Sequence, residues 1–171
     1  MLAKKLASGI LCVVLQVALT DRMMAAAATD TLQLRAPSHD PVTLTAADLK
    51  ALPHITVTVH NSHTDADETY AGVRVADLFT KAKLGVPLGG ELRGKALSGY
   101  IVATGSDGYR AVLALAEIDP SFHTGEVMVA DLMNGKPLDE HSGPFKLVVT
   151  EDKRPARWVR NLVSLELKMA D

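Results

Sequence analysis

Basic side chains gather around the single tryptophan of the chain, close to its C-terminal end. Arg157 and Arg160 flank Trp158, and Lys153 and Arg154 come just before them. An arginine offers several donors in a planar fork that matches phosphate and carboxylate groups, and an indole ring offers a flat face for stacking. The cluster therefore fits a small anionic ligand with a planar part. It fits equally well a solvent-exposed basic edge on which Arg157 stacks against Trp158.

A second group of polar side chains lies between residues 60 and 68. His60 and His63 are three residues apart, and Asp65, Asp67 and Glu68 follow them. Imidazole and carboxylate ligands together suit zinc or another divalent ion. The spacing matches no strict metal motif, and the chain has no nucleophile elbow or phosphate loop. The sequence therefore favours a polar loop here, and we assign neither metal ligands nor catalytic residues.

Residues 1–28 have the pattern of a secretory signal peptide. Lys4 and Lys5 supply the positive start, an apolar stretch runs from Leu6 to Thr20, and alanines at 26–28 offer a cleavage site before Thr29. We expect a periplasmic or secreted mature protein without membrane association. An uncleaved anchor is the alternative, but the apolar stretch is shorter than the ~20 residues that span a bilayer.

The cysteine count limits the chemistry of the mature protein. The single cysteine, Cys12, lies in the predicted signal peptide, so residues 29–171 contain neither a thiolate nor a disulfide. The formal net charge of the whole chain is −2, and the predicted signal peptide is basic. We therefore expect no nucleic-acid partner. The length of residues 29–171 suits one domain.

Hydrophobic periodicity predicts many short strands and two short helices. Alternating apolar and polar residues indicate strands at 31–35, 42–44, 55–59, 100–104, 109–115, 127–132, 145–150 and 163–167. One helix should begin after Thr45, which forms a capping-box pattern with Asp48. Another should bury an apolar face made of Val75, Leu78, Phe79 and Ala82. A polar loop is expected at 61–69.

Turn signals join several of these strands. Asp107-Gly108 and Asn134-Gly135 are pairs that tolerate positive φ and close tight hairpins. We therefore predict a single α+β domain with a mainly antiparallel, curved sheet and a few short helices.

Five short segments occur in an order that is more informative than any one of them. Together they resemble the molybdopterin-binding domain of the sulfite oxidase family, and in particular its small single-domain bacterial members. The resemblance covers roughly Ala46 to Lys168. The segments are Gly72-Val73, Ser106-Asp107-Gly108-Tyr109, Asn134-Gly135-Lys136-Pro137-Leu138, Gly143-Pro144-Phe145-Lys146-Leu147-Val148-Val149 and Arg157-Trp158-Val159-Arg160.

The resemblance implies which residues would bind a cofactor. In this family, the segment that corresponds to Arg157, Trp158, Val159 and Arg160 wraps the phosphate and pterin of the cofactor. His141 stands where the family has a histidine or asparagine, and Lys146 stands where it usually has arginine. Lysine keeps the positive charge and loses the bidentate geometry of arginine. We expect molybdopterin as the candidate cofactor, held less tightly than in the family.

The resemblance also implies a metal ligand that this chain lacks. The family places a cysteine in the loop after the strand that corresponds to 55–59, and the shorter stretch 60–68 contains none. A soft thiolate ligand is not replaced by imidazole without a change in chemistry. We therefore expect little or no molybdenum and no oxidation of sulfite.

Three functions remain open at this point. The first is an exported binder of a pterin or other small anionic ligand that works without the metal thiolate. The second is a molybdenum-cofactor-dependent oxidoreductase that works with a redox partner. The third is a ligand-free interaction module in which the cleft that binds the cofactor in the family instead contacts a periplasmic protein partner. Whether the protein is an enzyme stays undecided, because a fold alone carries many functions.

Overall fold

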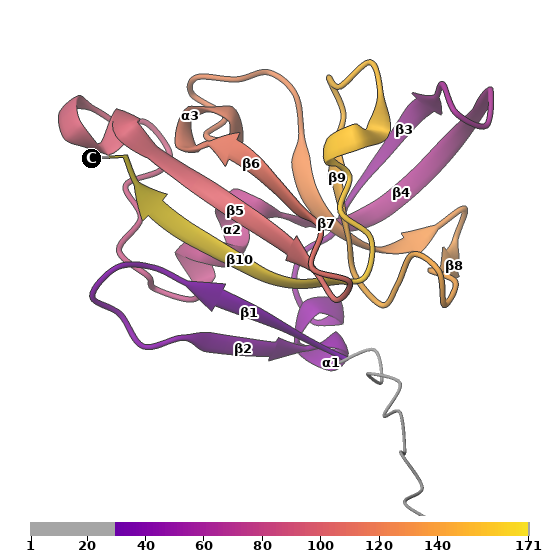
Figure 1. Cartoon of the computed structure of the whole chain (residues 1–171), viewed down its shortest axis with the longest axis horizontal. Helices are drawn as coiled ribbons and strands as arrows, with labels where there is room; N and C mark the ends of the chain where they lie inside the picture. Colours follow the sequence, from indigo (N-terminus) through magenta and orange to yellow (C-terminus); the bar gives the residue numbers. More distant parts are fainter. Residues whose placement is uncertain (1–29, 171) are drawn as a thin grey trace, which may run out of the picture.

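A computed structural model describes residues 30–170 as two five-stranded sheets that share one core (Figure 1). The first sheet has the strand order β2-β1-β10-β5-β6. β1 and β10 pair in parallel, and the other neighbours in this sheet are antiparallel. Its strands are β1 (Thr31–Arg35), β2 (Val42–Thr45), β5 (Gly99–Gly105), β6 (Arg110–Ala114) and β10 (Leu162–Met169).

The second sheet is antiparallel and carries Lys146 of the predicted site. β7 lies at its centre and pairs with β4, with β9 and with β8, while β3 pairs with β4. Its strands are β3 (Ile55–Asn61), β4 (Ala66–Arg74), β7 (Val127–Met133), β8 (Lys136–Pro137) and β9 (Lys146–Val149).

Short helices connect the strands and cover the core. They are α1 (Ala46–Lys50), α2 (Val75–Lys81) and α3 (Leu115–Ile118), with 3-10 turns η1 (Gly94–Ser98) and η2 (Pro155–Arg157). Thr45 caps α1 through the predicted capping box, because its hydroxyl accepts from the Asp48 amide and the Asp48 carboxylate accepts from the Thr45 amide. Leu78 and Phe79 of α2 are fully buried, as their spacing predicts.

The predicted α+β domain with mainly antiparallel strands is confirmed, with two differences in detail. The strands form two sheets instead of one. The polar loop predicted at 61–69 is wrong, because β3 continues to Asn61 and β4 begins at Ala66, with a turn at 62–65 between them. The paired strands carry polar side chains here, such as the hydroxyls of Thr58 and Thr69 at 3.0 Å from each other, so hydrophobic alternation does not reveal the pairing.

A bulge distorts the pairing of β4 with β7. Ala71 lies opposite Leu132 and Gly72 lies opposite Ala130, so Asp131 has no partner on β4. The backbones approach closely here, since a Cβ on Gly72 would lie 2.1 Å from the Val129 carbonyl oxygen. A bulge of this kind re-aims side chains, and Asp131 and Leu132 line the same pocket although they are adjacent in sequence.

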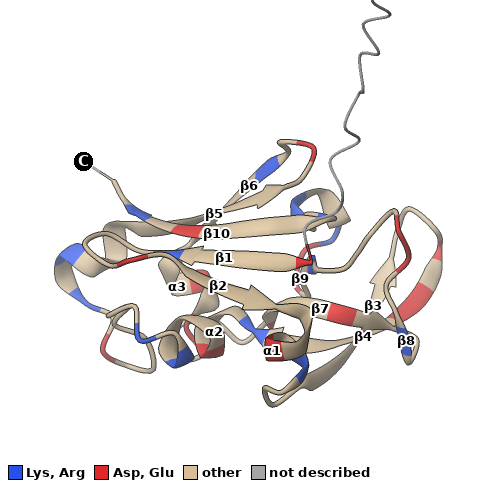
Figure 2. Cartoon of the chain, turned by 90° about the horizontal axis from the view of Figure 1, so that it is seen from below, with Lys and Arg blue, Asp and Glu red and all other residues tan. Residues whose placement is uncertain are grey.

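Charges of both signs are mixed on the face seen in Figure 2, and acidic residues are prominent on β4 and the loop beside it. An anion must therefore be attracted by particular basic groups, since this face carries no broad basic stripe. The predicted signal peptide lies outside the described residues. Within residues 30–170, no helix is long and apolar enough to cross a membrane.

Candidate ligand-binding site

The structure brings four of the six predicted site residues to one pocket of about 490 Å³, here called the Lys146 pocket. Its size lies in the range of small-molecule sites. His141, Lys146, Trp158 and Arg160 are the predicted residues among its lining. Asn61, Tyr70, Lys146 and Trp158 are buried, whereas His63, Asp139, His141 and Arg160 are exposed at the rim.

A chain of hydrogen bonds crosses the buried part of the pocket. Lys146 Nζ donates to the Tyr70 hydroxyl at 2.6 Å, and that hydroxyl donates to Glu68 Oε2 at 2.6 Å. Asn61 Nδ2 and the Thr64 hydroxyl donate to the other oxygen, Glu68 Oε1, at 2.9 and 3.3 Å. The carboxylate is thus fully engaged within the protein, while Lys146 has two further N–H donors to offer.

Burial leaves the positive charge of Lys146 without a full electrostatic partner. Desolvation lowers the pKa of Lys146, and Arg160 adds to that effect against the opposing influence of Glu68 and Asp139. Burial alone would raise the pKa of Glu68, but its hydrogen bonds from Tyr70 and Asn61 and the nearby Lys146 charge leave it below the usual value. The two shifts describe an ionised acid and a lysine that lacks a direct carboxylate partner among the described residues.

Two aromatic rings form a wall around the amine. Tyr70 and Trp158 meet edge to face, with ring centroids 5.9 Å apart. Lys146 Nζ lies 4.6 Å from the Tyr70 centroid and 5.5 Å from that of Trp158, within cation–π range. The Trp158 indole donates to the Val149 carbonyl at 3.0 Å and is only 6% exposed. Trp158 therefore shapes the pocket and fixes the amine more than it offers an open stacking face.

Contacts between residues 141–142 and residues 160–161 hold the rim of the pocket in place. An Arg160 guanidinium nitrogen contacts His141 Nε2. The side chain of Asn161 donates to the His141 carbonyl at 3.0 Å, and its backbone amide donates to the Ser142 carbonyl at 2.9 Å. These bonds keep His141 and Arg160 side by side, where both can reach a bound anion.

Arg157 and Val159 do not line the pocket, unlike the other four predicted residues. In an extended segment alternate side chains share one side, so Trp158 and Arg160 face the pocket while their neighbours face elsewhere. Arg157 bonds Asp152 at 2.6 Å and Glu117 at 2.9 Å, and these bonds raise its pKa, the Asp152 bond most strongly. The Val159 side chain is fully buried, and its carbonyl accepts from the Leu147 amide at 2.8 Å.

The sequence analysis did not assign three inner residues of the pocket, Asn61, Glu68 and Tyr70, to the ligand site. The region appeared to be a loop, so its side chains had no predicted direction. The spacing of Glu68 and Tyr70, two residues apart, is the signal that could have placed them on one face of a strand.

The histidines of the β3–β4 hairpin do not converge on one site. His60 is exposed and faces Asp67 at 3.1 Å and Asp65 at 3.4 Å, whereas His63 lines the Lys146 pocket. Within residues 30–170, no group of three or more histidine, cysteine or acidic side chains could hold a metal ion.

The donor set of the pocket fits an anionic organic group better than a molybdenum centre. It offers ammonium, guanidinium and imidazole groups, which suit phosphate or carboxylate oxygens. Cys12, the single cysteine, lies outside the described residues, so residues 30–170 provide no thiolate at this position. The pocket thus fits the phosphate of a pterin cofactor and does not fit a metal held through protein sulfur.

Comparison with known families decides the relationship. The family described as "Oxidoreductase molybdopterin binding domain" matches residues 20–171. The chain belongs to this family. Membership confirms the resemblance seen in the sequence and implies molybdopterin as the general cofactor of the family.

A solved structure confirms the fold. The chain is similar to the crystal structure of the sulfane dehydrogenase SoxCD from Paracoccus pantotrophus, with a TM-score of 0.60 and 19% sequence identity. The similarity covers 80% of this chain and 37% of that one, so the family member spans well under half the length of its structural neighbour. At this identity the likeness concerns the fold alone. No curated protein matches the sequence significantly.

Proposed function

We propose that this family member is a periplasmic binder of a pterin or other small anionic ligand, and that it works without a molybdenum–thiolate bond. The observation that carries the proposal is the buried Lys146 amine, which is held by a hydroxyl and two aromatic rings with Arg160 and His141 nearby. An anion would supply the negative partner that the protein does not place directly against Lys146.

Hydrogen bonds within the protein hold the acidic residues of the pocket. Both oxygens of Glu68 already accept such bonds. Asp139 accepts from the Ser142 amide at 2.9 Å and is exposed at the rim. Lys146 and Arg160 can still donate to a ligand, and phosphate or carboxylate oxygens accept such bonds.

Binding of such a ligand should shift the protonation equilibrium of Lys146. An anion beside Lys146 favours the charged form of the amine and raises its pKa from the lowered value of the ligand-free protein. The same contact would position the phosphate end of a pterin, and Arg160 would close over it from the rim.

Titration calorimetry with a phosphorylated pterin tests the proposal, with inorganic phosphate as a second probe. We expect Lys146→Met and Arg160→Ala each to weaken binding about tenfold or more, the loss of a charge-assisted bond. Lys136→Ala, on exposed β8, serves as the control and should bind normally. Absence of binding by either probe, or full binding by Lys146→Met, would refute the proposal and favour a ligand-free module that docks a periplasmic protein.

Family membership favours a second function, a molybdenum-cofactor-dependent oxidoreductase that works with a redox partner. That reading requires the metal to be held without protein sulfur. Stoichiometric molybdenum in the purified protein, together with sulfite turnover, would establish it.

A further inference from the structure

A second pocket lies behind the first, on the other face of the same strands. It measures about 440 Å³ and is called here the His54 pocket. Ala71 and Leu132 line it, whereas their strand neighbours Tyr70 and Met133 line the Lys146 pocket. Because adjacent residues of a strand point to opposite faces, the β4–β7 pair separates the two pockets.

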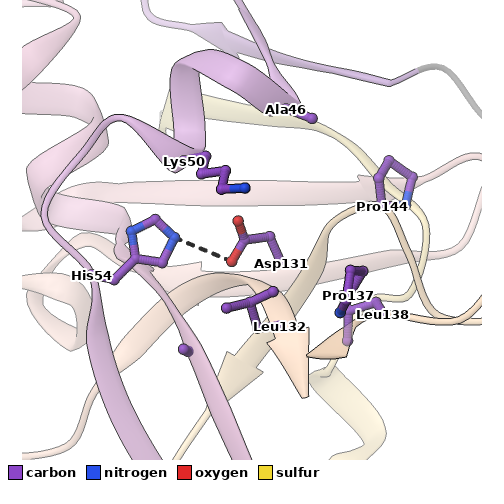
Figure 3. A pocket seen from close by; sticks show the side chains of 9 residues that line it. Ala46, Lys50, His54, Asp131, Leu132, Pro137, Leu138 and Pro144 are labelled. Carbon is purple, nitrogen blue, oxygen red and sulfur yellow. Dashed lines mark hydrogen bonds and ion pairs between the residues drawn. The ribbon is translucent and has the colours of Figure 1, made fainter. Parts of the chain in front are cut away.

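Polar and apolar groups are separated within this pocket. Figure 3 shows Lys50, His54 and Asp131 gathered on one side, and Pro137, Leu138 and Pro144 on the other. The bulge in β7 makes this possible, because it leaves Asp131 unpaired on β4 and brings it to the same pocket as Leu132.

The histidine and the aspartate contact each other. His54 Nδ1 lies 2.8 Å from the Leu52 carbonyl oxygen, and His54 Nε2 lies 3.1 Å from Asp131 Oδ1. Both ring nitrogens are engaged, so His54 is fixed in place, and Asp131 Oδ1 already has a partner within the protein.

Lys50 is the basic side chain that this pocket offers to a ligand. It is the last residue of α1 and an exposed member of the lining, and it forms no ion pair with any residue between 30 and 170. The apolar side of the pocket borders a hollow that contains Asp30 and Glu140 and shares Leu138 and Pro144. An anionic group is thus favoured beside Lys50 and disfavoured at the opposite end.

We propose that the His54 pocket binds a small carboxylate with an apolar body. The carboxylate pairs with Lys50, and the apolar body lies against Leu132, Leu138 and Pro144. The volume suits a ligand of modest size. Asp131 faces His54, and Lys50 forms no ion pair within residues 30–170, which is why the pocket selects an acid over an amine.

Hexanoate, hexanol and hexylamine are matched probes for this site on the full-length protein, followed by amide chemical shifts in NMR titrations. We expect saturable binding of hexanoate with Kd on the order of 1 mM or tighter, as small ligands allow. The shifts should centre on Ala71 and Leu132. Hexanol should bind about tenfold more weakly, because it lacks the charge, and hexylamine should not bind measurably.

Variants complete the test. Lys50→Gln should weaken hexanoate binding about tenfold, whereas Lys81→Gln, in the last turn of α2, should leave it unchanged. Lys146→Met should also leave it unchanged, which separates this site from the proposed pterin-type site. Equal binding of hexanol and hexanoate, preference for hexylamine, indifference to Lys50→Gln, or dependence on Lys146 would overturn the proposal.

Discussion

The two pockets share strands β4 and β7 but hold their buried charges in opposite ways. In the His54 pocket, a half-buried histidine and a half-buried aspartate contact each other, and Lys50 lies exposed at the edge. In the Lys146 pocket, the cation is buried and is held by a hydroxyl and two aromatic rings. The first arrangement is complete without a ligand. The second leaves a desolvated amine that a bound anion would complete.

The Lys146 pocket is where the protein gives up stability for a binding site. A buried charge without a direct opposite partner weakens the ligand-free fold, and such costs are typical of functional positions. The His54–Asp131 pair should instead support the fold. Substitutions can therefore separate the two pockets by the sign of their effect on stability.

The largest effect is expected from a substitution that disrupts the β4–β7 pair, which both pockets share. Gly72→Val would drive a side chain into the Val129 carbonyl and Ala130, which lie within 2.6 Å of the position a Cβ would take. We expect a loss of about 3 kcal/mol or more in the free energy of unfolding, together with loss of both pockets. Urea denaturation measures it, and Thr56→Val on exposed β3 is the control. A stable Gly72→Val protein would show that the two strands do not need their close approach.

Breaking the contact between His54 and Asp131 should destabilise the fold around the His54 pocket. Asp131→Ala leaves His54 Nε2 without its carboxylate partner, and we expect a loss of about 1–2 kcal/mol in the free energy of unfolding. Asp131→Asn can still pair with a neutral histidine and should cost clearly less. Equal stability of the alanine variant and the wild type would mean that the pair contributes nothing.

Removing the buried Lys146 amine should raise the free energy of unfolding instead of lowering it. Lys146→Met keeps the apolar stem and removes the desolvated charge, so we expect about 1 kcal/mol of stabilisation of the ligand-free protein near pH 7. Thermal melts at several pH values measure it. A marked loss of stability in Lys146→Met would contradict the contrast between the pockets.

The pH dependence of that effect follows from the lowered pKa of Lys146. Between its folded pKa and the usual value of 10.5, the unfolded chain binds more protons, so the wild type gains stability as pH rises through that window. The cost of the lysine is complete below the folded pKa. The advantage of Lys146→Met should therefore be largest at neutral pH and shrink toward pH 10.5.

The smallest effects on stability distinguish two neighbouring arginines. Arg160→Ala, at the exposed rim, should change the free energy of unfolding by less than about 0.5 kcal/mol while weakening anion binding. Arg157→Ala breaks the bonds to Asp152 and Glu117 and should cost about 1 kcal/mol while leaving binding intact. Denaturation paired with calorimetry would show whether the roles are reversed.

The sequence predicted much of the frame and only part of the site. Capping at Thr45, the buried face of α2 and the hairpin at Asn134-Gly135 follow from local rules, and Asn134 and Gly135 do adopt positive φ. The family resemblance located Lys146, Trp158 and Arg160 because their motifs are local. The direction of Arg157 could not be predicted, since it depends on Glu117, which is 40 residues away, as well as on nearby Asp152.

The His54 pocket could not be predicted from the sequence for a similar reason. His54 and Asp131 are 77 residues apart, and a one-residue register shift between β4 and β7 decides that they meet. Periodicity reports neither register nor bulges. Tyr70 had no predicted direction, because the hairpin strand that carries it was predicted as a polar loop up to residue 69.

The measurement that tests the central claim most directly is the molybdenum-to-protein ratio of protein purified from its own host, with the released ligand analysed by mass spectrometry. We expect a ratio near zero, with a pterin or another small anion released on denaturation. A ratio near one with sulfite turnover would contradict the claim that the Lys146 pocket works without a molybdenum–thiolate bond.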